Sequence, residues 1–146
     1  MSLTAIRAQL KTNLATITGV KVVYNPPPSI PPSFSELPAV IIDKSTPSLT
    51  TTHEAIAYVR YTHHVNVKFL FTAMGEDNYA QWMANLEKFY ALFDAKINSD
   101  IKLSGAATFV ADNHVYSEGV VNYLGTDYYG FDLTFDVIEK VSTPMA

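Results

Sequence analysis

The chain has 146 residues, no cysteine and a formal net charge of −4, and only 16% of its residues are charged. This length predicts one domain, spanning residues 1–146, and the absence of cysteine excludes disulfides, thiolate nucleophiles and cysteine-ligated metal sites. The acidic balance argues against specific nucleic-acid binding, which needs a basic patch. A charge content below the usual ~25% fits either a monomer with an uncharged polar coat or a protomer that buries surface in an oligomer.

The first elements are an amphipathic helix and a short strand. Apolar residues recur at helical spacing from Leu3 to Ile17, and Gly19 can end the helix because glycine accepts the left-handed conformation. Val20 to Tyr24 then alternates as a strand does. The segment lacks the apolar core of a signal peptide, and no stretch approaches the ~20 apolar residues of a membrane helix. We therefore expect a soluble protein that does not bind membranes.

Six prolines crowd the next segment, from Asn25 to Pro38. Because proline lacks an amide donor and fixes φ, the segment is expected to run extended over the surface. It is either a stiff connection between strands or a docking loop with Ile30 and Phe34 as exposed anchors. Ala39 to Asp43 follows, and its continuous apolar run is typical of a strand covered on both faces.

The longest pattern in the chain is a period-two alternation from Ala55 to Phe71, which predicts one long strand. At ~3.3 Å per residue it would span about 56 Å, more than the ~40 Å diameter of a compact domain of this size. The Ser/Thr-rich stretch Lys44 to Glu54 has the composition of a loop, and it joins the Ala39 strand to this long strand, so we expect the two strands to pair as a hairpin. We therefore predict a hairpin arm, about residues 46–59, that projects from the body with Thr50 to Thr52 at its tip.

The second half predicts a helix and three strands. The helix is capped by Asp77 or Asn78 and carries a wide aromatic face that includes Trp82 and Phe89, which we expect to be core residues. The strands are predicted at Ala107 to Ala111, Val115 to Leu124 and Tyr128 to Val141, joined by short turns into an antiparallel meander. Gly119 and Gly130 mark bulges or close backbone approaches. The prediction is an α+β fold, α-β-β-β-α-β-β-β, with a largely antiparallel sheet, two helices on one face and a long projecting hairpin.

No stretch carries a motif for catalysis or cofactor binding, so we expect neither an enzyme nor a cofactor. Neighbouring strand residues point to opposite faces, so His63 and His64 should not ligate one metal together. Asp132, Thr134 and Asp136 mark the polar face of a strand. The glycines form neither a phosphate loop nor a dinucleotide fingerprint, and the serines lack a nucleophile elbow.

The layout of the whole chain resembles the tail terminator, or tail-completion, proteins of long-tailed bacteriophages. The likeness is carried by the element order and by two stretches, Leu37-Pro38-Ala39-Val40-Ile41-Ile42 and Tyr128-Tyr129-Gly130-Phe131-Asp132-Leu133. The resemblance implies a virion protein, assembled in the host cytoplasm, that forms a hexameric ring on the tail tube. Such a ring ends tail polymerisation and offers a joining surface to the head. Its partners would be other copies of itself, the tail tube protein and a neck or connector protein.

The expected contact residues between chains lie mainly in the predicted arm. They are Pro47, Ser48, Leu49, Thr50, Thr51, Thr52, His53, Glu54, Ile56 and Tyr58, together with Ile30 and Phe34. One alternative is another neck component, a stopper or head-tail joining protein. A second is a small-ligand-binding α+β domain, in which polar residues such as Tyr61 and His63 would converge inside the sheet.

Overall fold

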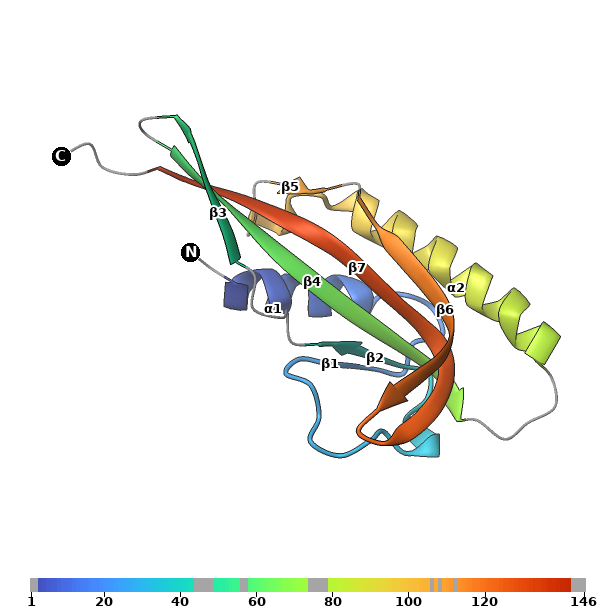
Figure 1. Cartoon of the computed structure of the whole chain (residues 1–146). Coiled ribbons are helices and arrows are strands. Elements are labelled where there is room, and N and C mark those ends of the chain that lie inside the picture. The colour runs from blue at the N-terminus through green and yellow to red at the C-terminus, as the bar shows by residue number, and fades with distance from the viewer. Residues whose placement is uncertain are drawn as a thin grey trace.

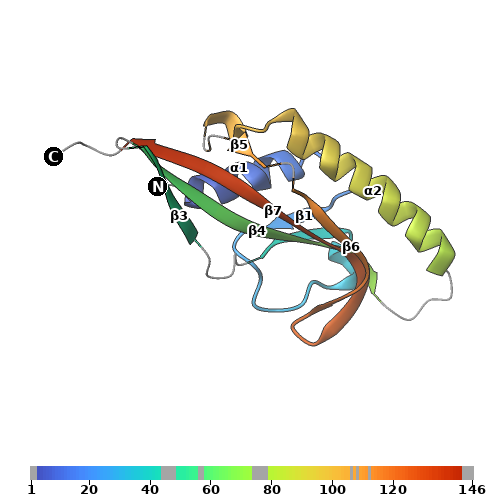
Figure 2. The same cartoon turned by 45° about the horizontal axis from the view of Figure 1, so that its top comes forward.

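The computed structural model describes residues 3–43, 49–55, 58–73, 79–105, 107, 109–111 and 113–142. Its elements are α1 (Leu3–Leu14), β1 (Val22–Tyr24), the 3-10 helix η1 (Phe34–Glu36), β2 (Ala39–Ile42), β3 (Leu49–Ala55), β4 (Tyr58–Ala73), α2 (Tyr79–Ser99), the 3-10 helix η2 (Leu103–Gly105), β5 (Phe109–Val110), β6 (Val115–Tyr123) and β7 (Thr126–Ser142). The fold is α+β, with a mostly antiparallel sheet and both helices on one side of it, as the sequence predicts (Figures 1 and 2).

Two long antiparallel strands, β4 and β7, form the centre of the sheet. They pair along almost their whole length, from Tyr58 opposite Ser142 to Ala73 opposite Tyr128. The other edge of β4 is shared by two short strands, because β3 pairs with its first part and β2 with its last. The other edge of β7 is divided in the same way between β5 and β6. β1 pairs with β2 in parallel, whereas the other described strand pairs of the sheet are antiparallel.

The main hydrophobic core lies between the sheet and the two helices. It joins α1 residues such as Leu10 to α2 residues such as Phe93 and to the inward row of β4 and β7. Phe69 is its centre, with ring centroids 4.9 Å from Phe131, 5.3 Å from Phe93 and 4.8 Å from Phe89. The Phe131 ring is stacked on that of Phe69, the Phe93 ring is edge-on to it and the Phe89 ring is tilted, and stacked and edge-on arrangements are favourable for aromatic pairs. Aromatic side chains therefore fill the centre of this layer.

A second hydrophobic cluster lies where β4 ends and β6 and β7 meet. It contains Ala39, Ile41, Leu70, Tyr123 and Tyr128 with their apolar neighbours. The Pro-rich segment is bonded to it, because the buried hydroxyl of Tyr128 donates to the carbonyl of Pro32 at 2.7 Å and that of Tyr123 donates to the carbonyl of Pro28. Burial raises the pKa of both tyrosines.

Gly130 on β7 is required by the close approach of β4. A Cβ at this position would overlap the carbonyl oxygen of Phe69 and lie only 2.9 Å from the carbonyl carbon of the same residue. The β4–β7 register shifts between Leu70 and Thr72, directly beside this contact. The expectation that Gly130 marks a close approach is thus confirmed. Phe71 is skipped in the register, so β4 has one residue more than β7 beside this contact, as in a β-bulge.

The prediction of a loop from Lys44 to Glu54 is wrong for residues 49–54, because residues 49–55 form strand β3. Threonine is β-branched and suits a strand when a partner edge is present, and β4 supplies that edge. Ala55 and Tyr58 face each other across this pair, so Ala55 belongs to β3 and the long strand predicted from Ala55 begins at Tyr58. Thr50 to Thr52 therefore lie within the strand, and the expected tip at these residues is corrected.

Three further expectations need correction. Helix α1 ends at Leu14 instead of Ile17, because the chain tightens there into a turn with Thr16 bonded to Asn13 and Gly19 at a positive φ of 97°. β2 and β4 pair antiparallel as predicted, but β3 intervenes between them in the chain. The last three strands do not form a meander, since β5 pairs with β7 and leaves β6 to pair farther along the same edge.

Candidate functional site

The most distinctive surface is the end of the sheet that extends past the helices, which we call the arm. It consists of β3, residues 58–62 of β4 and residues 139–142 of β7. Among positions whose side chains the structure describes, buried residues begin at His63 on β4 and end at Ile138 on β7. The arm thus leaves the core as a three-stranded ribbon (Figures 1 and 2).

The sequence-predicted contact residues fall into two groups that the fold does not bring together. Leu49 to Glu54 lie in β3, and Tyr58 begins β4, so these residues share the arm. Ile30, with 74% of its surface exposed, and Phe34, the first residue of η1, belong to the Pro-rich segment at the opposite end of β4 (Figure 1). The other three predicted residues, Pro47, Ser48 and Ile56, lie outside the described residues.

Arg7 of α1 fixes the chain where it leaves the body towards the arm. Its guanidinium donates to the carbonyl of Asp43 at 2.7 Å, to the carbonyl of Ile42 at 2.5 Å and to Oδ1 of Asn25 at 3.0 Å. Burial lowers the pKa of Arg7, and the carboxylate of Asp43 partly opposes that shift. One side chain therefore holds the helix, the end of β2 and the start of the Pro-rich segment in a fixed relation.

A row of polar pairs crosses β4 and β7 on the face away from the helices. Nζ of Lys68 donates to Oδ1 of Asp132 at 2.8 Å, and Asn66 lies opposite Thr134. The sequence indicated the polar face of β7, but it could not show which β4 residue meets which β7 residue. That information requires the register. Cross-strand ion pairs of this kind support the pairing of the two central strands.

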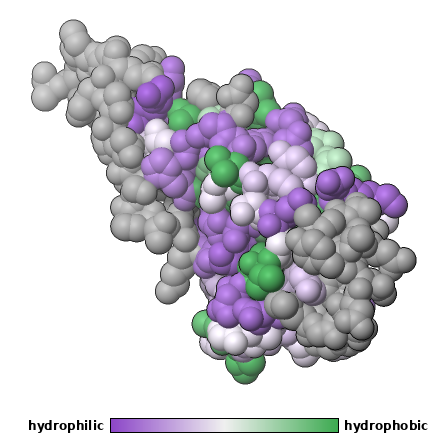
Figure 3. Space-filling view, turned by 45° about the vertical axis from the view of Figure 1, so that its right-hand side comes forward, coloured by the Kyte–Doolittle hydropathy of each residue, from purple (hydrophilic) through white to green (hydrophobic). Residues whose placement is uncertain are grey.

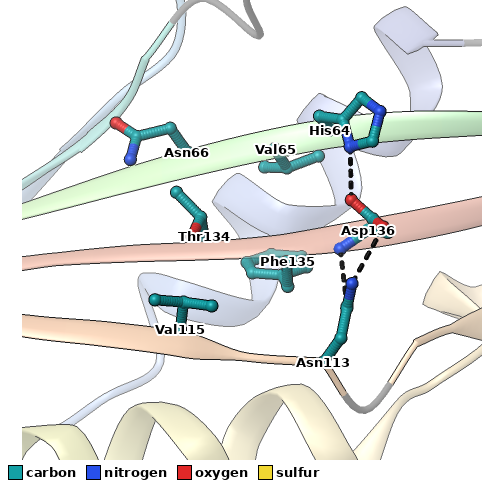
Figure 4. Close-up of a pocket in the computed structure, with 8 residues that line it drawn as sticks. All are labelled: His64, Val65, Asn66, Asn113, Val115, Thr134, Phe135 and Asp136. Carbon is teal, nitrogen blue, oxygen red and sulfur yellow. Dashed lines mark hydrogen bonds and ion pairs between the residues drawn. The ribbon is translucent and has the colours of Figure 1, made fainter. Parts of the chain in front are cut away.

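The row ends at a shallow groove of about 190 Å³ lined by His64, Asn66, Asn113, Asp136 and neighbouring residues (Figure 4). Asp136 is its centre: Oδ1 lies 2.6 Å from Nδ1 of His64, and Oδ2 accepts from Nδ2 of Asn113 at 2.8 Å. Oδ1 of Asn113 accepts from the backbone amide of Asp136 at 3.2 Å. Asn113 thus provides a hydrogen-bond partner for the backbone of β7 between its pairings with β5 and β6, so the cluster has a structural role.

His63 and His64 lie on opposite faces of the sheet, as the alternation of strand side chains predicts. His63 is buried on the helix face with Nε2 3.4 Å from Oε1 of Glu139, whereas His64 lies in the groove on the other face. His114 pairs with Asp94 of α2 at 2.9 Å. Within the described residues no group of three or more histidines and carboxylates is placed to hold a metal ion.

Exposed apolar side chains occur singly on the face seen in Figure 3, where green residues are separated by hydrophilic ones. Among all the described residues, the exposed large apolar side chains are those of Ile30, Leu92, Ile101, Val115, Val120 and Leu124. Isolated apolar residues are normal for a protein surface and do not define a docking patch. The backbone edges of the arm are therefore the stronger candidate for contact with another chain.

Two further findings bear on the class of the protein. Among the described helices none is both long and apolar enough to cross a membrane. No model of a known protein family matches the chain, and no curated protein matches it either.

Proposed function

We propose that this chain is a structural virion protein of a long-tailed bacteriophage, which forms a ring on the tail tube, stops tail polymerisation and offers a joining surface to the head. The arm is the observation that carries the proposal. At ~3.3 Å per residue, β4 and β7 span about 53 and 56 Å, while a compact body of this size measures about 40 Å. The excess length extends beyond the core instead of folding back onto it.

An extended sheet end suits assembly because its outer strands carry backbone donors and acceptors that a partner strand can pair with. A ring uses such surfaces in a head-to-tail manner, so every protomer gives one surface and receives the other until the circle closes. The low charge content of 16% agrees with a protomer that buries part of its surface. The family resemblance in the order of elements supplies the hexameric number and the place on the tail.

Light scattering on the purified chain during size-exclusion chromatography tests the ring. We expect a discrete oligomer, with six copies as the proposed number, and a monomer at all accessible concentrations would refute the proposal. The arm is tested by replacing residues 47–57 with a short Gly-Ser turn. The chain should still fold, because loop shortening changes closure entropy by less than about 1 kcal/mol and β4 keeps its pairing with β7.

The shortened variant should lose the ring and should fail to complete tails in a phage complementation assay. Tails of irregular length would indicate a terminator, whereas normal tails without heads would indicate a stopper or head-tail joining protein. Ile30→Ser is the matched control, since Ile30 is exposed at the opposite end of the molecule. If Ile30→Ser abolishes the ring and the shortened arm does not, the Pro-rich segment is the interface and the arm has no part in it.

A further inference from the structure

The arm has two outer edges, one on each side, and they lie at the same end of the sheet. On one side β3 is hydrogen-bonded to β4. On the other side β7 pairs with β5 at Val137 and Ile138, and the strand pairing of the described positions 139–142 is with β4. Each protomer therefore presents two backbone edges at which a further strand can be added.

Proline marks the limits of both edges. Six of the eight prolines belong to the Pro-rich segment, and the remaining two are Pro47, two residues before β3, and Pro144, two residues after β7. Proline cannot donate to a strand ladder. Between these limits, residues 49–55 and 139–142 contain none, so proline removes no amide donor from either edge.

The strand directions restrict how two copies can join. β3 is antiparallel to β4, and β4 is antiparallel to β7, so β3 and β7 run in the same direction. Rotation about a ring axis that follows the strands leaves that direction unchanged. A ring would therefore bring β3 of one copy alongside β7 of the next copy as a parallel pair. A two-fold axis would instead pair an edge with its own copy in antiparallel orientation.

We propose that β3 of one protomer pairs in parallel with residues 139–142 of β7 in its neighbour, so that the arms join into one continuous sheet around the ring. This inference rests on the proposed ring and adds the identity and direction of the joint. A second copy is the partner because every chain carries both halves of the joint, at the same end and in compatible direction.

Cysteine cross-linking tests the joint cleanly, because the natural chain has no cysteine. Thr52 and Lys140 both align with Arg60 of β4 and so share one face of the sheet. Neighbouring strands lie about 4.8 Å apart, within the Cα separation that a disulfide spans. Thr52→Cys/Lys140→Cys tests one register. Thr50→Cys/Lys140→Cys, on the same face, tests a register two residues away.

After oxidation, at least one double variant should give a ladder of covalent multimers that ends at the ring number on a non-reducing denaturing gel. The single variants should remain monomeric on that gel. Lys140→Cys/Asn122→Cys is the control, because Asn122 is exposed near the β6–β7 turn, far from the arm. Covalent dimers from a single variant would overturn the joint in favour of two-fold pairing. A ring without a ladder from either double variant would overturn the joint alone, and a monomeric natural chain would overturn the joint and the ring together.

Discussion

Gly130→Ala should destabilise the protein more than the same substitution at Gly119, the glycine paired with it in the sheet. Gly130 lies on β7 between Leu70 of β4 and Gly119 of β6. Its φ does not fall in the left-handed region, so the new methyl group would act by collision and not by backbone strain. The atoms that it meets belong to the backbone of Phe69 and Leu70. A flexible side chain could move aside, but these atoms are held by the central pairing.

The cost follows from the contacts. Beyond the overlap with the oxygen of Phe69, the methyl carbon would lie 2.9 Å from the carbonyl carbon and 3.3 Å from Cα of Leu70. Relieving this overlap requires the two central strands to separate locally. Overpacking costs about 1–3 kcal/mol, and a weakened ladder bond adds about 1 kcal/mol. We expect a loss of about 3 kcal/mol, which for a chain of this size lowers the melting temperature by about 6–12 °C.

Chemical denaturation followed by circular dichroism measures the loss, with Gly119→Ala as the control. Gly119 has a φ of 133° and no atom within 4 Å of its added Cβ, so its substitution carries only a conformational cost of about 1–2 kcal/mol. Gly130→Ala should exceed it clearly. If Gly130→Ala costs less than 1 kcal/mol, or less than Gly119→Ala, the close approach of β4 and β7 is not a constraint on this position.

Three other predictions concern the core, the anchor of the arm and alkaline pH. Phe93→Ala should lower the free energy of unfolding by about 3–5 kcal/mol because the ring is fully buried. Phe89→Ala should lower it less because Phe89 is only partly buried, and equal losses of stability in urea denaturation would contradict this order. Arg7→Met should cost about 2 kcal/mol by removing three hydrogen bonds, and Arg7→Lys should recover only part of it; thermal melts that match the natural chain would exclude an anchoring role. Stability should fall as pH rises above about 10. Tyrosine in the unfolded chain ionises there, whereas Tyr123 and Tyr128 stay neutral in the fold because burial raises their pKa values. The double variant Tyr123→Phe/Tyr128→Phe should flatten this decline, and an unchanged slope of stability against pH would show that other groups cause it.

The sequence was sufficient for the elements whose side chains repeat regularly. The strict alternation of Phe131, Leu133 and Phe135 with polar residues predicted β7, and the continuous apolar run predicted that β2 would be covered on both faces. Phe89 packs against the core as expected, although it is only partly buried. The expectation that Trp82 is a core residue concerns a side chain outside those described.

What the sequence could not provide is pairing. The Thr-rich stretch of β3 has no apolar alternation of its own, and its strand conformation depends on the edge of β4 far along the chain. The polar pairs between β4 and β7 were visible as two separate patterns, but their alignment depends on the register. Arg7 had no distinguishing signal in the sequence, because its three acceptors come from residues 18 to 36 positions away and two are backbone carbonyls. Ile30 was expected to be exposed and is, but its role in any contact stays a prediction.

The central pairing of β4 with β7 also governs how the chain can acquire its fold. Ala73 and Tyr128 are 55 residues apart in the sequence, and Tyr58 and Ser142 are 84 apart. Contacts of such long range make folding slow, on the scale of milliseconds to seconds. During synthesis on the ribosome, β4 emerges well before β7 and has a long edge without its final partner. Nascent chains of this protein should therefore depend on chaperones, or on rapid translation of the segment between the two strands, until β7 has been made.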